Sequence, residues 1–185
     1  MKTDSHIKNW CQAGILALII SGSILHFVFP WTGELKIIGI IAPVNESVWE
    51  HLKMGYWSLT FFSIFEYKKI KNQVNNYFFA KLIGILALEL TIIIVFYSYT
   101  FITRNSILWI DISSYVVGSI MCQVVVYQLQ KQKPVSVFIN RLALTGFICL
   151  GILLGVTTFY TPPYPLFQDS RNDTYGINKD HLPSL

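Results

Sequence analysis

Five stretches of the chain are largely apolar, the second after a polar first turn, and each is long enough, as a helix, to cross a lipid bilayer. They cover residues 11–29, 45–67, 80–103, 107–129 and 138–160. A helix rises about 1.5 Å per residue, so about 20 residues cross the roughly 30 Å of hydrocarbon. Helices are expected because lipid cannot hydrogen-bond open backbone groups and because no strand-length alternation recurs. The pattern predicts an all-α bundle of about five transmembrane helices.

The remaining segments are polar or too short to cross. The chain divides into an N-terminal segment, a transmembrane domain and a tail with four prolines, at residues 1–10, 11–160 and 161–185. The tail either folds back over the end of the bundle or extends away from the bundle as a disordered segment. Residues 35–42 form a short apolar run between Pro30 and Pro43. This run predicts either a re-entrant segment or a helix that lies on the membrane surface.

Small residues recur at intervals of four within several of the spans. Gly151 and Gly155 form one such pair, and Ser114, Gly118 and Cys122 form a second series. Small residues let helix backbones approach closely in lipid. They predict a compact bundle, with a contact face for a second copy of the chain as the alternative.

The composition agrees with a membrane protein. Of the 185 residues, 53% are hydrophobic and only 13% are charged, and the mean hydropathy is +0.49. A soluble domain is typically about 25% charged. This composition excludes a disordered chain, a nucleic-acid-binding module and an ordinary cytosolic enzyme.

The positive charges predict how the spans are oriented. If the N-terminus is cytoplasmic, nine of the 14 Lys and Arg residues lie on the cytoplasmic side: Lys2, Lys8, Lys68, Lys69, Lys71, Lys81, Lys131, Lys133 and Arg141. The other five are Lys36, Lys53, Arg104, Arg171 and Lys179. Cytoplasmic loops carry an excess of positive charge. We therefore expect a multi-pass protein with a cytoplasmic N-terminus and an extracytoplasmic C-terminus.

A run of ionisable residues marks the start of the second span. Residues 45–53 read Asn-Glu-Ser-Val-Trp-Glu-His-Leu-Lys, and Glu46 and Glu50 are four residues apart, so they share one helix face. Two interpretations stay open. Ser47 and Glu50 fit a capping box, which satisfies free amides at the start of a helix. Alternatively, the two acids and His51 belong to a functional site, as ionisable residues within a membrane commonly do.

His26 lies near the end of the first span, at the same predicted depth as His51. Imidazole and carboxylate groups together suit zinc or another divalent ion, and equally a proton-transfer pair. The sequence therefore predicts a candidate metal site of His26, Glu50 and His51. Glu46 beside it, and Glu50 itself, are candidate catalytic groups. The alternative for His26 is a hydrogen-bonded packing residue.

Two further acids lie within the spans and complete the set of candidate catalytic residues. Asp111 is near the start of the fourth span, where it either acts in the site or complements the helix dipole. Glu89 lies a third to a half of the way through the third span. A carboxylate at that depth must be neutral or paired. It either locks helices together by a hydrogen bond or belongs to a proton or ion path.

The block at residues 45–53, together with His26 and the Pro-Pro-Tyr-Pro-Leu-Phe run at residues 162–167, resembles an uncharacterised family of small bacterial multi-pass membrane proteins. The resemblance extends over essentially the whole chain. It implies a location in the bacterial plasma membrane and no particular reaction.

Three classes of function follow from these features. The first is a membrane-embedded hydrolase that uses a divalent metal ion such as zinc on a lipid-linked substrate. The second is a small ion- or proton-coupled transporter, and the third is a non-catalytic subunit or scaffold of a larger membrane complex. Membrane lipids are expected partners, and nucleic acid is not. The chain holds no Walker A, Rossmann, GxSxG or HExxH motif, so chemistry with a soluble cofactor is not expected.

Overall fold

The computed structural model describes residues 2–177, and within them the chain forms helices and no strand. The five long helices are α1 (Lys2–Trp31), α2 (Val48–Ile70), α3 (Tyr77–Thr103), α4 (Leu108–Lys131) and α5 (Val137–Phe159). Two short 3₁₀ helices are η1 (Lys36–Ile40), between α1 and α2, and η2 (Pro165–Phe167), after α5. The predicted all-α fold is confirmed.

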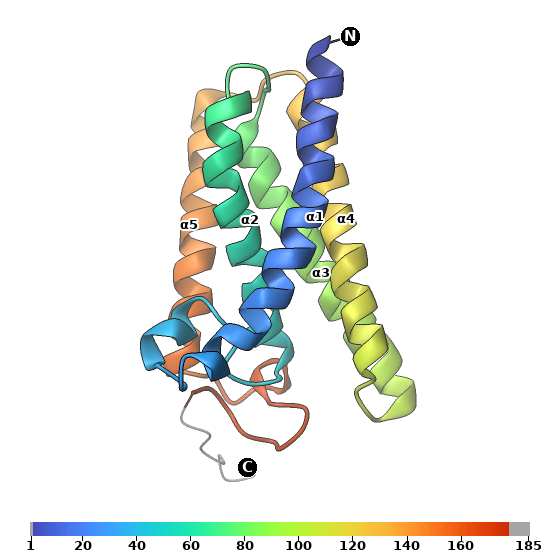
Figure 1. Cartoon of the computed structure of the whole chain (residues 1–185), viewed down its shortest axis with the longest axis vertical. Helices are drawn as coiled ribbons and strands as arrows, with labels where there is room; N and C mark the ends of the chain where they lie inside the picture. Colours follow the sequence, from blue (N-terminus) through green and yellow to red (C-terminus); the bar gives the residue numbers. More distant parts are fainter. Residues whose placement is uncertain (1, 178–185) are drawn as a thin grey trace.

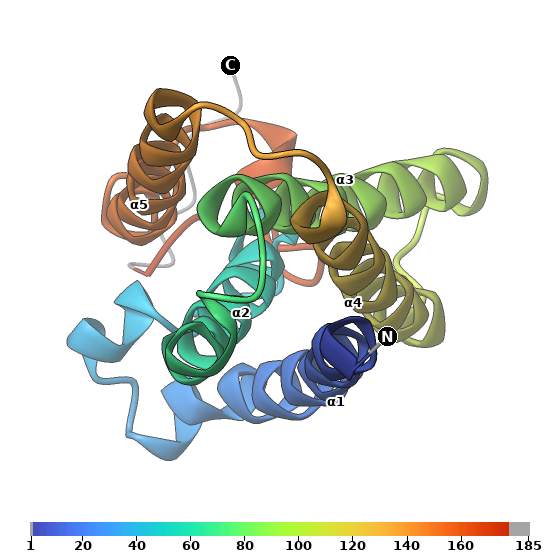
Figure 2. The ribbon, with the colours of Figure 1, turned by 90° about the horizontal axis from the view of Figure 1, so that it is seen from above.

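The five helices run alternately up and down the bundle (Figure 1). One end carries the N-terminus and the α2–α3 and α4–α5 loops, and we call it the N-terminal end. The opposite end, which we call the η1 end, carries η1, the α3–α4 turn and the segment after α5. Seen along the bundle in Figure 2, α2 and α3 lie toward the middle. In agreement, α2 packs against α1, α3 and α5, and α3 also packs against α4 and α5.

Four of the described helices are long and apolar enough to cross a membrane: Asp4–Trp31, Tyr77–Thr103, Leu108–Lys131 and Val137–Phe159. The fifth, α2, has a similar length of 23 residues but is more polar. Three of its charged side chains, Glu50, Lys53 and Glu66, are buried inside the bundle, whereas Lys68 and Lys69 in its last turn are exposed. The outer surface is instead rich in large apolar side chains, such as Phe101 and Ile102, which is the surface that contact with lipid requires.

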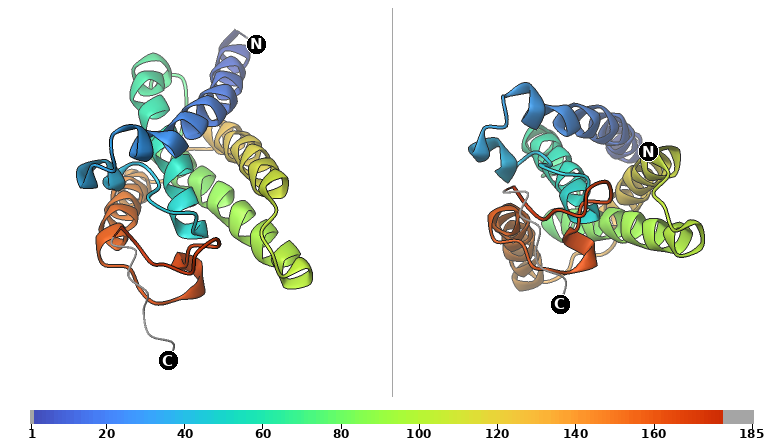
Figure 3. Two further views of the ribbon diagram at one scale, coloured as in Figure 1. Left: turned by 60° about the horizontal axis from the view of Figure 1, so that its bottom comes forward. Right: turned by 90° about the horizontal axis from the view of Figure 1, so that it is seen from below.

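The segments outside the predicted spans also have defined structure. Helix α1 already begins at Lys2, so the predicted N-terminal segment is helical over its described part. The short apolar run at 35–42 contains η1 and flanks α1 and α5. Residues 161–177 fold back across the η1 end beside the start of α2 (Figure 3). The last part of the predicted tail, with Lys179 and Pro183, lies outside the described residues.

Small residues allow the helices to approach closely inside the bundle, as their spacing predicts. A Cβ atom on Gly118 would lie 3.2 Å from the backbone oxygen of Leu88 on α3. A Cβ atom on Gly84 would lie 3.1 Å from the backbone oxygen of Cys122 and 2.6 Å from a methyl group of Val126. Backbone atoms cannot move aside as a flexible side chain can, so α3 and α4 depend on glycine at these positions.

We expect Gly84→Ala to destabilise the protein by about 1–3 kcal/mol, because the added methyl group overpacks the α3–α4 contact. The matched control is Gly146→Ala, whose Cβ would meet only the side chain of Leu82. There the better helix propensity of alanine should leave stability equal or higher. Thermal unfolding of the purified protein in detergent measures both changes. Equal effects at the two positions would contradict the close approach.

Candidate functional site

The start of α2 is held by a set of local hydrogen bonds. The Ser47 hydroxyl accepts from the Glu50 amide at 3.3 Å, and the Asn45 side chain accepts from the Ser47 amide at 3.0 Å. These bonds satisfy amides that the first turn leaves free. They begin the helix at Val48, so Glu46 lies just before the helix and His51 in its first turn.

The segment after α5 positions Glu46. The Glu46 amide donates to the Asp169 carboxylate at 3.0 Å, and the Glu46 carbonyl accepts from the Ser170 hydroxyl at 3.3 Å. The Arg171 guanidinium lies 3.4 Å from Glu46 Oε1 and is itself largely exposed. The backbone of Glu46 is therefore held by residues more than a hundred positions later in the chain, and its carboxylate lies next to the positive charge of Arg171.

Three side chains converge at this position. Glu46 Oε2 lies 3.4 Å from His51 Nε2, and Glu46 Oε1 lies 3.8 Å from His26 Nε2. The two imidazole rings stack with their centroids 5.6 Å apart. One ligand atom from each of His26, Glu46 and His51 lies within 4.8 Å of the others. Each side chain is about a quarter exposed, so the cluster is reachable from solvent.

The hydrogen bond at the other side of the His51 ring decides how that ring faces Glu46. His51 Nδ1 lies 2.8 Å from the Ser47 carbonyl oxygen, which can only accept, so Nδ1 carries a hydrogen. In a neutral ring, Nε2 then presents a lone pair toward the Glu46 carboxylate. Two acceptors facing each other need a cation, which is either a proton on Nε2 or a metal ion between them.

The separations are compatible with either cation, since the three ligand atoms lie within 4.8 Å of one another. An N–H···O hydrogen bond spans about 2.7–3.2 Å, which is shorter than the two contacts of Glu46. Tetrahedral zinc with bonds of about 2.0–2.1 Å places its ligand atoms roughly 3.3–3.4 Å apart. The contacts of 3.4 and 3.8 Å are close to that value. A hydrogen bond and positive charge from the His51 ring lower the pKa of Glu46, against the effect of burial, and His26 and Arg171 add to this. This lowering belongs to a protonated His51, which is the alternative to a bound metal ion.

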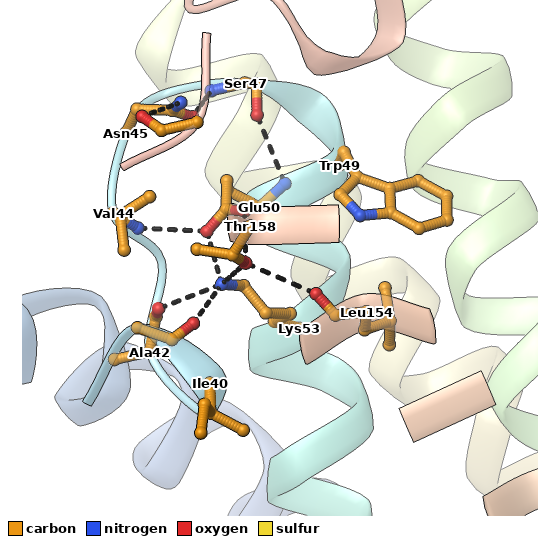
Figure 4. Close-up of polar contacts among 12 residues, drawn as sticks. Ile40, Ala42, Val44, Asn45, Ser47, Trp49, Glu50, Lys53, Leu154 and Thr158 are labelled. Atoms are coloured by element: carbon orange, nitrogen blue, oxygen red, sulfur yellow. Dashed lines mark hydrogen bonds and ion pairs between the residues drawn. The ribbon is translucent and has the colours of Figure 1, made fainter. Parts of the chain in front are cut away.

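Glu50, predicted as a ligand beside the histidines, lies instead in a separate buried cluster (Figure 4). Its carboxylate forms an ion pair with Lys53 at 2.5 Å and accepts from the Val44 amide and the Thr158 hydroxyl. The Lys53 ammonium also donates to the carbonyls of Gly39 and Ala42 and to Thr158. Glu50 and Lys53 are both buried. The partners of Glu50 come from α2, α5 and the loop after η1. Glu50 therefore has a structural role, because it links these three segments.

The other two predicted acids lie outside the group of His26, Glu46 and His51. Asp111 accepts a hydrogen bond of 2.6 Å from the Tyr99 hydroxyl and is close enough to interact electrostatically with His51. Glu89 is buried in the interior on α3. Arg171 was not singled out from the sequence as a site residue, because nothing in the local pattern of the tail links it to Glu46.

The fold and the site together define a helical protein with four apolar helices that suit a membrane and a group of possible metal ligands at one end. The chain belongs to the family of unknown function DUF6512, which it matches over residues 1–177. No match was found among curated proteins or solved structures.

We expect Lys53→Ala to destabilise the protein by about 3–5 kcal/mol, because it leaves the Glu50 carboxylate buried without its counter-charge. The control is Lys131→Ala, which removes an exposed ion pair with Asp4 and should cost about 0–1 kcal/mol. Thermal unfolding in detergent compares the two variants. If Lys53→Ala is no worse than Lys131→Ala, the ion pair does not hold this end of the bundle together.

Proposed function

We propose that the protein is a metal-dependent hydrolase of the membrane, in which His26, Glu46 and His51 hold a divalent ion such as zinc. The observation that carries the proposal is the orientation of His51. Its Nδ1–H is directed to the Ser47 carbonyl, so its other nitrogen, Nε2, faces the Glu46 carboxylate at 3.4 Å; in a neutral ring that nitrogen presents a lone pair to a metal ion. A second histidine lies at 3.8 Å from the same carboxylate.

The donor set is that of a catalytic zinc site. Two imidazoles and one carboxylate supply three protein ligands and leave a fourth position for water or substrate. The partial exposure of all three side chains supports access to that position. A carbonyl that holds the distal nitrogen of a metal-binding histidine is also a common supporting contact, since it fixes the tautomer.

The residues around the cluster suit hydrolysis of an anionic substrate. A bound ion of this kind lowers the pKa of a coordinated water toward neutrality. Arg171 lies at the exposed edge, where its guanidinium can bind a phosphate or carboxylate group in a bidentate manner. Asp111, held by Tyr99, is a second carboxylate near His51. It is the candidate general base in this proposal.

The location of the site supports a lipid-linked substrate. Exposed aromatic side chains surround the η1 end, including Trp31, Trp109 and Tyr160, and aromatic residues gather where a membrane meets water. The Lys and Arg distribution supports an extracytoplasmic position for this end, and the resemblance of the sequence supports a bacterial plasma membrane. A site among lipid headgroups would act on the polar part of a lipid-linked molecule.

A protonated His51 paired with Glu46 is the competing explanation of the same geometry, and it would suit a scaffold or a subunit of a larger complex. In that case the cluster fastens α1 to the start of α2 and binds no metal. The two explanations differ in whether the purified protein takes up a divalent ion.

We expect the purified protein to bind one Zn²⁺ or Co²⁺ per chain, with Co²⁺ showing the visible absorption of tetrahedral coordination. Loss of one ligand in His26→Ala, Glu46→Gln or His51→Ala should weaken binding by at least as much as loss of a supporting contact to a ligand does, which is about 10–100-fold. The matched control is His6→Ala, because His6 pairs with Gln73 at the N-terminal end. Titration calorimetry and metal analysis measure the effect. If the native chain binds no ion, or if the control loses as much affinity as the ligand variants, the metal proposal fails.

The proposed orientation makes a separate prediction. Single cysteines at Lys69 and Gln132 lie exposed at the N-terminal end, and one at Asn172 lies exposed at the η1 end. In intact cells an impermeant thiol reagent should label position 172 and not positions 69 and 132. Labelling of all three after the membrane is opened is the control. The reverse pattern would place the histidine cluster on the cytoplasmic side.

A further inference from the structure

The interior of the bundle holds polar groups that the site at the η1 end does not use. Between the N-terminal end and the middle of the bundle, several buried side-chain atoms have no hydrogen-bond partner: both amide atoms of Gln123 and of Gln130, Oε1 of Glu66 and Oε1 of Glu89. They come from α2, α3 and α4. Glu66 and Lys81 also form a buried ion pair, and Tyr77 donates to the same carboxylate at 2.8 Å.

These groups share one part of the interior. Gln123 and Gln130 are seven residues apart on α4, and therefore lie on one helix face. The Gln123 amide also packs against α1, since a Cβ on Gly14 would lie 2.7 Å from it. Lys81 and Glu89 of α3 and Glu66 of α2 all lie close enough to the Cys122 thiol to interact with it electrostatically. Glu66 and Glu89 thus lie near the part of α4 that packs on α3, and Gln123 follows Cys122 directly in the chain.

Such an interior is unfavourable if it is dry. A buried polar atom that loses water and gains no partner carries its full desolvation penalty, and two glutamines here lack partners on both the oxygen and the nitrogen. Proteins satisfy groups of this kind with internal water, each molecule of which makes about three hydrogen bonds. Water is small enough to reach groups that no side chain can reach.

We propose that water fills this part of the bundle and connects the N-terminal end to Glu89, which makes Glu89 an internal proton-binding site. The ion pair of Glu66 and Lys81 and the amide of Gln130 stand nearest the N-terminal end, and Gln123 lies beyond them. The reaction is a simple transfer: hydronium gives one proton to the Glu89 carboxylate, forming the carboxylic acid and leaving water. The surrounding apolar helices favour the neutral acid over the charged form.

The surroundings of Glu89 suit this assignment. The titratable groups that interact with it from the packed helices are Tyr56 on α2 and Cys122 on α4. The Tyr56 hydroxyl donates to the Phe147 carbonyl, and neither group carries a charge that would hold a carboxylate in place. Glu89 is 6% exposed, so proton exchange by direct contact with bulk solvent is closed. A path through the interior is the remaining route.

Infrared spectroscopy of the full chain in lipid vesicles tests the proposal. The band of the Glu89 carboxylic acid is identified as the one absent in Glu89→Gln. On transfer to D₂O, this band should shift as soon as mixing is complete, because water already reaches the group. In Gln123→Met, which keeps the side-chain length and removes the polar atoms, exchange should slow by about tenfold or more, because it then waits for local opening.

The matched control is Gln12→Met, the same substitution on an exposed position of α1, which should exchange as fast as the native chain. Gln130→Met provides a second variant of the path if Gln123→Met does not fold. Slow exchange in the native chain would overturn the proposal, and so would exchange that neither path variant slows. Because the histidine cluster is intact in all of these variants, the result is independent of metal binding.

Discussion

The buried ion pair of Glu50 and Lys53 is the interaction on which the η1 end depends. Neither charge can leave its partner without becoming an uncompensated buried ion. Their remaining hydrogen bonds go to Thr158 and to the backbone of the loop before α2. The pair therefore ties three separate segments to one point. This loop precedes Glu46, whose carboxylate lies next to His26 of α1.

The same helix provides the ionic groups at both ends of the bundle. Near its start, α2 contributes Glu50 and Lys53, and near its end it contributes Glu66, which pairs with Lys81 of α3. Because α1, α3 and α5 pack around α2, these charges are kept away from the apolar exterior. The bundle is thus built around its most polar helix, and the four apolar helices supply the surface that faces lipid.

Much of the fold could be predicted from the sequence because lipid leaves few alternatives. Long apolar runs must become helices, and the spacing of Gly118 and Cys122 anticipated the close contact of α3 and α4. The shared depth of His26 and His51 also followed from counting spans. The two rings stack because α1 packs against α2 and places the two histidines at the same depth.

The exact composition of the cluster could not be predicted, for a local reason. Spacing on a helix placed Glu46 and Glu50 on one face, but α2 begins only at Val48, so helical periodicity does not apply to Glu46. Its position is determined by Asp169, more than a hundred residues later. The Glu50 carboxylate does not join the cluster, because it pairs with Lys53 and accepts a hydrogen bond from Thr158. No pattern within residues 45–53 contains either long-range partner.

The dependence of Glu46 on the segment after α5 also determines when the cluster can form during synthesis. His26, Glu46 and His51 leave the ribosome early, whereas Asp169, Ser170 and Arg171 follow only after the last long helix. A nascent chain that has placed its first helices in the membrane still lacks the contacts that hold the Glu46 backbone. The cluster is therefore completed last, and a chain truncated after α5 would carry the three side chains without the support that aligns them.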